Sequence, residues 1–298
     1  MFENVLVGID GSPNGRDAIE LARRLVDGEG QLTLAHVYSG ELNPLRAVQY
    51  DLLREDREKS DALLEREREA TSVDAQLQSV VALRAGAGLH RQAERQHADL
   101  LVVGSCSHGA FGRAMLGDHT REALNGAPCA VAVAARGYAE KLAPIRVVGV
   151  AYNGSPESEA ALDFARKLAR STGASIKALE VVSIPTVAYT GIMPPAIGES
   201  IDVMLKTATA RMSALPDVDG KAVYGPPGEE LATFSPEVDL LVVGSRGYGP
   251  VKRLVLGSTS DYLQRHARCS LLVLPRVPVS DTAEHGERAS ETTVGAAV

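Results

Sequence analysis

Two segments of the chain, 99–120 and 239–260, share a pattern of residues that could bind an anion. Each begins as an apolar run, continues as a glycine-rich loop and ends where a helix is expected to begin. Glycine allows the tight turns that point several backbone N–H groups into one concavity. The free N–H groups at a helix start add a positive partial charge. The chemistry that these segments favour is therefore the binding of a phosphate group.

The second segment has the fuller set of residues. Gly244 and Gly247 stand at the end of the apolar run and in the loop, and Gly257 and Ser258 stand at the expected helix start. The Ser258 hydroxyl can donate to a phosphate oxygen, and Arg253 can neutralise charge. Many glycine-rich loops between a strand and a helix bind nothing. The prediction of a phosphate site therefore depends on the repetition of the pattern and on the serine-rich helix start. The candidate phosphate-binding residues of this copy are Gly244, Gly247, Arg253, Gly257, Ser258, Thr259 and Ser260.

The first segment keeps the same frame with two changes. Ser107 stands where the second glycine is expected, and Asp118 stands where the helix-start serine is expected. An aspartate caps a helix well, but it repels a phosphate and could weaken binding by on the order of 100-fold in a partly dry site. We therefore expect this site to be weak or empty, although Arg113 and Thr120 can still contact a phosphate. The candidate residues of this copy are Gly104, Ser107, Arg113, Gly117 and Thr120.

The elements that position these loops alternate between strands and helices in both halves of the chain. The apolar runs are continuous, which is typical of parallel strands covered by helices on both faces. Each half therefore predicts a doubly wound α/β domain with a five-stranded parallel sheet, and ligands bind such sheets at the carboxyl ends of the strands. We expect domains over 1–137 and 144–277. The expected strands lie within 4–12, 31–37, 77–83, 100–104 and 130–134, and then from 147, 174–182, 221–224, 240–244 and 271–274.

Other segments have expectations of their own. Ser12–Pro13 is typical of a helix start, with the Ser12 hydroxyl as the N-cap. The charged segment 45–70 predicts a long, solvated helix, and 137–144 is expected to be the linker. The proline-containing segment 184–198 predicts a mobile loop near the second site. The polar tail 278–298 is expected to be disordered.

The composition limits the classes of function. The net charge is −7, and an acidic chain is poorly suited to bind nucleic acid. No apolar run is long enough to cross a membrane and no secretory signal pattern is present, so we expect a cytoplasmic protein. The three cysteines are too scattered for a disulfide framework or a zinc site. Cys129 and Cys269 precede apolar strands and are expected to be small buried side chains.

The loop of the second half resembles the ATP-binding motif of the universal stress protein family. It has a glycine, two residues, a glycine, nine residues and then Gly257–Ser258. The VGIDGSP and VAYNGSP segments, the two DLLVVGS runs and the closing APCAVAV and ARCSLLVLP segments are also similar to that family, so the resemblance covers about residues 1–275 as a tandem. The resemblance implies the sheet order 3-2-1-4-5 in each half and a tendency to dimerise. It also implies ATP binding with Mg²⁺ on the phosphates.

The adenine and ribose contacts of that family fall, by position, at the ends of the first and second strands of each half. These positions are Asp10 and Val37 in the first half, and Asn153 and Val181 in the second. An aspartate can accept hydrogen bonds from ribose hydroxyls or help hold a metal, whereas Asn153 keeps the hydrogen bonding without the charge. Asp10 also has a simpler interpretation as a turn residue before Gly11. No protein ligand of the metal is singled out.

We expect an ATP-binding regulatory module of the stress response rather than a turnover enzyme. No Walker lysine, nucleophile elbow or kinase catalytic-loop pattern is present, although slow ATP hydrolysis stays open. The alternatives are a dimerising interaction scaffold with a vestigial site, and a site for AMP or a cyclic nucleotide. The last strands of the two halves, 130–134 and 271–274, could pair within the chain as a pseudo-dimer, or the protein could associate with a second copy.

Overall fold

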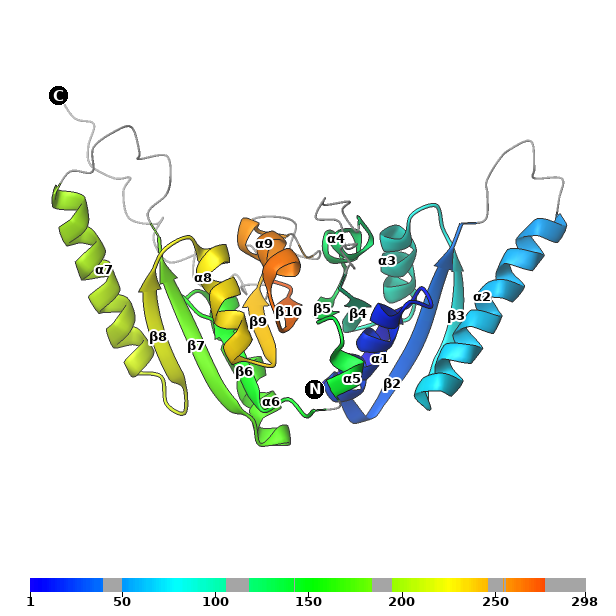
Figure 1. Cartoon of the computed structure of the whole chain (residues 1–298), viewed down its shortest axis with the longest axis horizontal. Helices are drawn as coiled ribbons and strands as arrows, with labels where there is room; N and C mark the ends of the chain where they lie inside the picture. The colour runs from blue at the N-terminus through cyan, green and yellow to red at the C-terminus, as the bar shows by residue number, and fades with distance from the viewer. Residues whose placement is uncertain are drawn as a thin grey trace, which may run out of the picture.

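The computed structural model describes residues 1–39, 50–105, 118–141, 143–183, 195–245, 254 and 256–276. The described strands form one 10-stranded sheet that runs through both halves of the chain (Figure 1). The strands of the first half are β1 (Phe2–Gly8), β2 (Val26–Tyr38), β3 (Gln76–Val81), β4 (Leu100–Gly104) and β5 (Ala130–Ala134). Those of the second half are β6 (Val147–Ala151), β7 (Ser175–Val182), β8 (Asp219–Tyr224), β9 (Leu240–Gly244) and β10 (Ser270–Leu274).

The strand order across the sheet is β3-β2-β1-β4-β5-β10-β9-β6-β7-β8. Each half therefore has the order 3-2-1-4-5, and the strands within each half pair in parallel. β5 and β10 are antiparallel neighbours, with Val131 opposite Val273 and Val133 opposite Leu271. The last strands of the two halves thus pair within one chain, which confirms the predicted pseudo-dimer arrangement.

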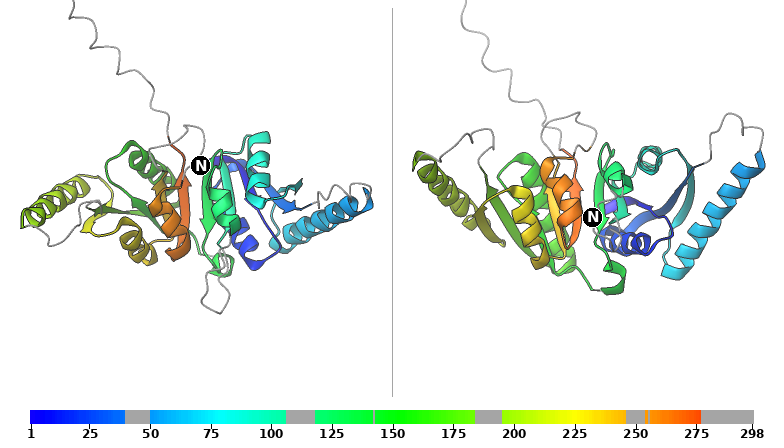
Figure 2. Two further views of the ribbon diagram at one scale, coloured as in Figure 1. Left: turned by 90° about the horizontal axis from the view of Figure 1, so that it is seen from above. Right: turned by 45° about the horizontal axis from the view of Figure 1, so that its top comes forward.

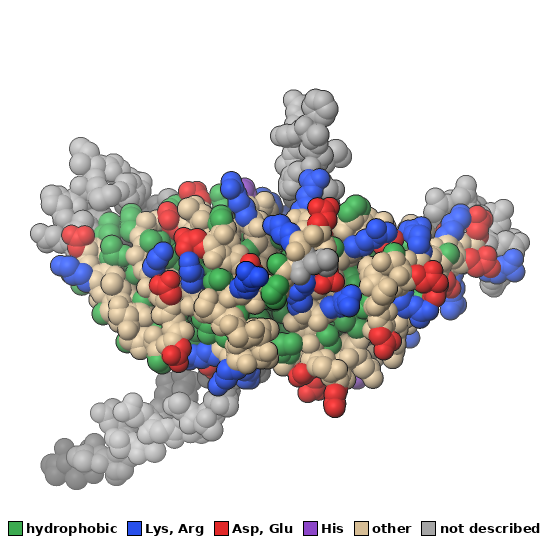
Figure 3. Space-filling view, turned by 60° about the horizontal axis from the view of Figure 1, so that its bottom comes forward, with side chains coloured by type: hydrophobic (Ala, Val, Ile, Leu, Met, Phe, Trp, Pro, Cys, Tyr) green, Lys and Arg blue, Asp and Glu red, His purple; other side chains and the backbone are tan. Residues whose placement is uncertain are grey.

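Helices cover both faces of the sheet, as continuous apolar strands require (Figure 2). The helices packed on one face are α1 (Pro13–Leu25), α2 (Tyr50–Thr71), α5 (Tyr138–Lys141), α6 (Pro156–Thr172) and α7 (Pro195–Ser213). The helices packed on the other face are α3 (Ala85–Arg95), α4 (Asp118–Leu124), α8 (Pro227–Phe234) and α9 (Ser258–His266). Acidic and basic side chains are interspersed on the surface that Figure 3 shows, as on an ordinary solvent-facing surface.

The two halves share their hydrophobic core. The apolar cluster on one face includes Leu21 of α1 and Leu162 of α6, and the cluster on the other includes Leu124 of α4 and Leu263 of α9. The ring centroids of Phe2 and Phe164 also lie 5.2 Å apart across the two halves. Because burial of apolar surface is the main stabilising term, each half contributes to the stability of the other.

The predicted side-chain cap at Ser12 is wrong. Ser12 is the N-cap of α1, yet its hydroxyl makes no capping hydrogen bond, and its Oγ is buried without a partner in the described structure. The N–H that such a cap would bind, that of Gly15, donates instead to the Ser12 carbonyl at 3.0 Å. At the start of α6, Ser155 does cap, because its Oγ accepts from the Ser158 N–H at 3.3 Å.

The connection between the halves, expected to be a linker, contains a short helix. α5 lies inside 137–144 and packs on α1. Asp17 of α1 is buried, and its two carboxylate oxygens accept hydrogen bonds from Gly137 N and Ala139 N, each at 2.8 Å. The guanidinium of Arg24 lies 5.2 Å from the ring centre of Tyr138. The chain is therefore docked on α1 where it leaves the first half.

Two further expectations need adjustment. α2 is not solvated on all sides, because Leu64 and Glu67 are buried and Arg16 Nε binds the Glu67 carboxylate at 2.8 Å. Burial acts to raise the pKa of Glu67, but the guanidinium groups beside it outweigh burial and lower that pKa overall. The segment 184–198 is not all loop, since α7 begins at Pro195. The rest of that segment and the tail 278–298 lie outside the described residues.

Candidate functional site

A cleft of about 470 Å³ lies at the carboxyl ends of β1, β2 and β4 in the first half. Its volume is in the range of small-molecule sites, which is roughly 300–1,000 Å³. The apolar side chains that line it include Ile9, Val37, Leu83, Leu89 and Val103, and the polar ones include Asp10, Ser12, His36, Ser105 and Thr120. A cleft lined by both apolar and polar side chains suits a ligand with an apolar ring and polar substituents.

The strand ends beside the site have the same turn in both halves. Asp10 Oδ1 accepts a hydrogen bond from Ser12 N at 3.0 Å, and Asn153 Oδ1 accepts one from Ser155 N at 3.1 Å. The residue between them, Gly11 or Gly154, has a φ of +76° in each case, a conformation that glycine adopts at little cost. The turn interpretation of Asp10 thus has a direct structural basis. The second carboxylate oxygen of Asp10 has no hydrogen bond within the described structure and stays available to a ligand.

The first glycine of each loop has a packing role. A Cβ placed on Gly104 would lie 2.3 Å from the Asn14 carbonyl oxygen, at the start of α1. A Cβ on Gly244 would lie 2.6 Å from the Glu157 Cβ, at the start of α6. Only glycine lets these helices approach the strand ends so closely. This part of the pattern is therefore explained by helix packing, whether or not a phosphate binds.

The structure brings four of the first-half candidates to one place. Asp10, Val37, Gly104 and Thr120 all line the cleft. The Thr120 hydroxyl donates to the Gly104 carbonyl at 3.0 Å, so its proton is already engaged. The other three candidates, Ser107, Arg113 and Gly117, lie outside the described residues.

The second-half candidates occupy the matching positions along the sheet. Gly257 is the N-cap of α9 without a side-chain cap, and the helix begins at Ser258 as predicted. Ser258 is exposed, Thr259 and Val181 are half-buried and Ser260 is buried. Asn153 and Gly244 lie at the ends of β6 and β9, whereas Gly247 and Arg253 lie outside the described residues.

Sequence reasoning missed a polar chain beneath the first cleft. His36 Nδ1 lies 2.9 Å from Ser60 Oγ, which lies 2.7 Å from Ser79 Oγ, and Ser79 donates to Asp61. Because the Ser79 proton goes to the Asp61 carboxylate, Ser60 must donate to Ser79, and His36 Nδ1 must carry a proton and donate to Ser60. Burial lowers the pKa of His36, against the opposing effect of the Asp10 charge. The residues come from three elements, so no local spacing signals them.

The matching position in the second half is filled differently. The hydrogen bonds from Ile9 N to Ala35 O and from Tyr152 N to Leu179 O align His36 with Glu180. Glu180 is buried, and Arg211 binds both of its carboxylate oxygens, with Nε at 3.1 Å and Nη2 at 2.9 Å. Beside it, burial and the Glu159 carboxylate raise the pKa of Tyr152 to about 12. The two halves therefore differ in charge and hydrogen bonding close to equivalent turns.

Two of the three cysteines are structural, as predicted. Cys129 and Cys269 are both buried, and burial raises the pKa of each thiol to about 12. Cys106 lies outside the described residues. Among the residues that the structure does describe, no three His, Cys, Asp or Glu side chains cluster as a metal site. No described helix is long and apolar enough to span a membrane.

A doubly wound parallel sheet with a cleft beyond its carboxyl edge defines a ligand-binding class of α/β proteins. Comparison with known protein families identifies the family of the chain. The model of the universal stress protein family matches residues 1–135 and again residues 144–275. The chain belongs to the universal stress protein family and contains two such domains in tandem.

Individual relatives are distant. Universal stress protein Rv2005c of Mycobacterium tuberculosis is 30% identical over 184 residues, which cover 59% of this chain and 61% of that protein. The match thus spans less than two thirds of the length of that relative. Universal stress protein YxiE of Bacillus subtilis is 30% identical over 141 residues, covering 42% of this chain and 95% of that protein. A universal stress protein structure from Archaeoglobus fulgidus, 19% identical, has a TM-score of 0.63 and covers 92% of this chain and 98% of its own.

Proposed function

We propose that this protein is a cytoplasmic regulatory module of the stress response that binds an adenine nucleotide. The observation that carries the proposal is the cleft beside the Asp10 turn, together with the same turn at Asn153 in the second half. In doubly wound sheets, nucleotides bind at this edge. Membership of a family with an ATP-binding motif supports the same class of ligand.

We assign the stronger ATP site to the second half. Gly257 and Ser258 begin a nine-residue helix whose first N–H groups favour an anion, and Ser258 is exposed to a ligand. Asn153 offers an amide to the sugar. Because Asn153 stands where the first half has Asp10, Mg²⁺ would be held chiefly by the phosphates, which is its usual mode in nucleotide sites.

The first half is proposed to bind ATP weakly. Its loop has Ser107 and Asp118 in place of glycine and serine, and its Thr120 hydroxyl is engaged by Gly104. Asp10 lines the cleft, and one of its carboxylate oxygens has no hydrogen bond within the described part of the chain, so a nucleoside part could bind there without the phosphates. AMP or a cyclic nucleotide, which carry fewer phosphate charges, would suit this half better than ATP does.

Calorimetric titration of the full chain tests the proposal. ATP with Mg²⁺ is expected to show one stronger and one weaker site, and AMP and cyclic AMP show how many phosphates matter. Two equal ATP sites would contradict the assignment to the second half. Absence of binding by all three ligands would remove the nucleotide function.

Exchange of the helix-start residues tests which half binds. Ser258→Asp places the residue of the first half in the second, and it should weaken the stronger ATP site by on the order of 100-fold through charge repulsion. The reciprocal variant Asp118→Ser should strengthen the weaker site. If Ser258→Asp left the stronger site unchanged, the phosphates would not lie at α9.

The second candidate is an interaction scaffold of the same fold that binds no nucleotide. Packing of Gly104 and Gly244 against α1 and α6, and the hydrogen bonds of Asp10 and Asn153 within their turns, favour it, because both would persist without a ligand. Nucleotide retained by protein purified without added ligand would argue against the scaffold.

A further inference from the structure

Residues 121–127 of the first half, which we call the α4–β5 corner, hold a segment of the second half. Gly126 N donates to Leu254 O, and Leu254 N donates to Ala127 O, each at 2.8 Å. Leu254 thus exchanges backbone hydrogen bonds with two consecutive residues of the corner. These bonds fix the backbone of Leu254 through both of its polar groups, and Leu254 stands four residues before Ser258.

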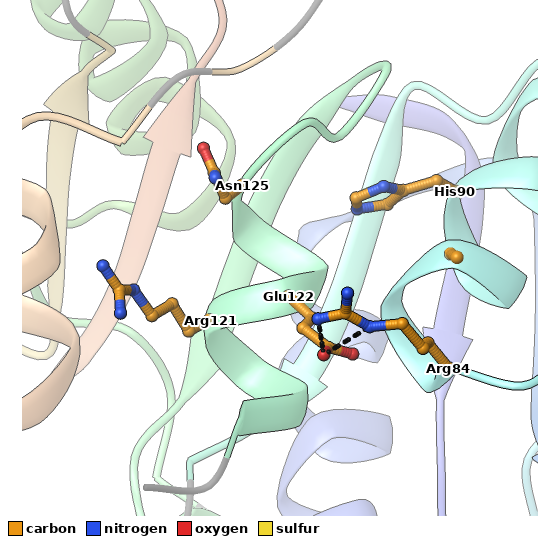
Figure 4. A pocket seen from close by; sticks show the side chains of 6 residues that line it. Arg84, His90, Arg121, Glu122 and Asn125 are labelled. Carbon is orange, nitrogen blue, oxygen red and sulfur yellow. Dashed lines mark hydrogen bonds and ion pairs between the residues drawn. The ribbon is translucent and has the colours of Figure 1, made fainter.

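Side chains extend the same contact toward α9. Leu254 is fully buried and belongs to the apolar cluster that contains Leu124 and Ala127 of the corner. Arg121 Nε lies 3.1 Å from Oδ1 of Asp261, a residue in the first turn of α9. Figure 4 shows Arg121 of α4 directed toward the second half, away from Arg84 and His90. One corner of the first half thus contacts the second half on both sides of Ser258.

We propose that the α4–β5 corner positions the start of α9 for phosphate binding by the second half. Arg121, Gly126 and Ala127 act as positioning residues and do not touch the nucleotide. An anchored helix start binds an anion better, because its N–H groups need not be ordered when the ligand arrives. The inference rests on the proposed function for the identity of the ligand. It gives the first half a role in the second site.

Two matched variants of the full chain test the positioning role. Arg265 also pairs with Asp261, but from within α9, so Arg121→Ala and Arg265→Ala each remove one positive charge and one partner of Asp261. Only Arg121→Ala breaks a contact between the halves. Arg121→Ala should weaken Mg²⁺–ATP binding by about three- to fivefold, the range of a partly exposed ion pair, while Arg265→Ala stays within about twofold. Equal effects of the two variants would contradict the inference.

Hydrogen exchange gives a readout that does not need the nucleotide. In the free protein, Arg121→Ala should speed exchange of the Leu254 amide and of the amides at 256–258, and Arg265→Ala should leave them unchanged. In the wild-type protein, Mg²⁺–ATP should slow exchange of the Gly126 amide, although Gly126 lies in the first half. Binding without any change at Gly126 would overturn the inference. If the wild-type protein bound no ATP, the proposed function would fail, and the exchange of the free variants would still decide whether the corner holds the segment.

Discussion

Gly104 and Gly244 show that one sequence pattern can have two explanations, helix packing and phosphate binding. Both belong to the repeated pattern that predicted a phosphate loop, and both are also needed where a helix start presses on a strand end. The spacing in the sequence predicted that both glycines end strands, and β4 and β9 do end at Gly104 and Gly244. It could not separate the two causes, because the atoms that press on Gly104 belong to Asn14, far away in the sequence.

Adding one methyl group at Gly104 measures the packing cause. Gly104→Ala should lower the free energy of unfolding by about 1–3 kcal/mol, the usual cost of overpacking, because its Cβ would lie 2.3 Å from a backbone oxygen. Gly28→Ala is the control, since nothing lies within 4 Å of a Cβ there. Urea unfolding of both variants checks the expectation, and equal stability would show that α1 adjusts freely.

His36 gives the first half a pH-dependent term in its stability. Burial lowers the pKa of His36 in the folded protein from its ordinary value of 6.5. As the pH falls below 6.5, the unfolded chain therefore binds more protons than the folded protein does. The contribution of His36 to stability should therefore be fully present well above pH 6.5 and be lost progressively as the pH falls below 6.5. Replacement by glutamine, His36→Gln, should flatten this slope. Urea midpoints at several pH values measure the slope, and an unchanged slope in His36→Gln would assign it to other groups.

At the scale of elements, the strands that the sequence predicted best are those buried on both faces. β4, β5 and β9 have the bounds that their apolar runs indicated, because no polar residue interrupts them. β2 begins at Val26, ahead of the predicted start at 31, through Asp27 and two glycines. Pairing of Val26 with Phe2, next to a register shift, extends the strand there. Such an extension depends on the partner strand and leaves no mark in the local pattern.

The helix α5 was not predicted from the sequence for a similar reason. Its support comes from Asp17 on α1, and the hydrogen bonds span 120 and 122 positions of sequence. Nothing within 137–144 distinguishes a docked turn of helix from a free linker. The polar chain from His36 to Asp61 was missed in the same way, since its members lie on β2, α2 and β3.

Removal of the Asp17 carboxylate tests the docking of the linker. Asp17→Ala leaves the N–H groups of Gly137 and Ala139 without their acceptors and should lower the free energy of unfolding by about 2 kcal/mol. Asp17→Asn keeps one acceptor oxygen and should lose about half as much. Chemical denaturation compares the two variants, and a neutral Asp17→Ala would show that water replaces the carboxylate.

At the scale of the whole molecule, the ten strands and the two apolar clusters behave as parts of one body. Both clusters contain side chains from each half, and β5 and β10 join the sheet edge to edge. The linker separates the halves in the sequence, but described apolar side chains of both halves belong to the same two clusters. The tandem repeat predicted two similar folds, and the pairing of the last strands was a further expectation that the sheet confirms.

A shared core predicts cooperative unfolding. Calorimetry of the full chain should show one transition with equal calorimetric and van't Hoff enthalpies, because neither half can unfold without exposing apolar surface of the other. A variant in one half, such as Gly104→Ala, should then shift the whole transition. Two resolved transitions, with only one of them moved by that variant, would show that the halves unfold independently.

Because both halves belong to one chain, the pairing of β5 with β10 joins one first half to one second half. If the halves were separate chains, like could pair with like, and a cell would hold a mixture of combinations. Covalent linkage gives each half a high effective concentration around its partner, so the unlike pair is the one that forms. Each molecule thus carries one Ser258 half and one Asp118 half in fixed proportion. A mutation in one half is therefore present in every molecule beside the same partner half, so the two halves can diverge toward separate tasks.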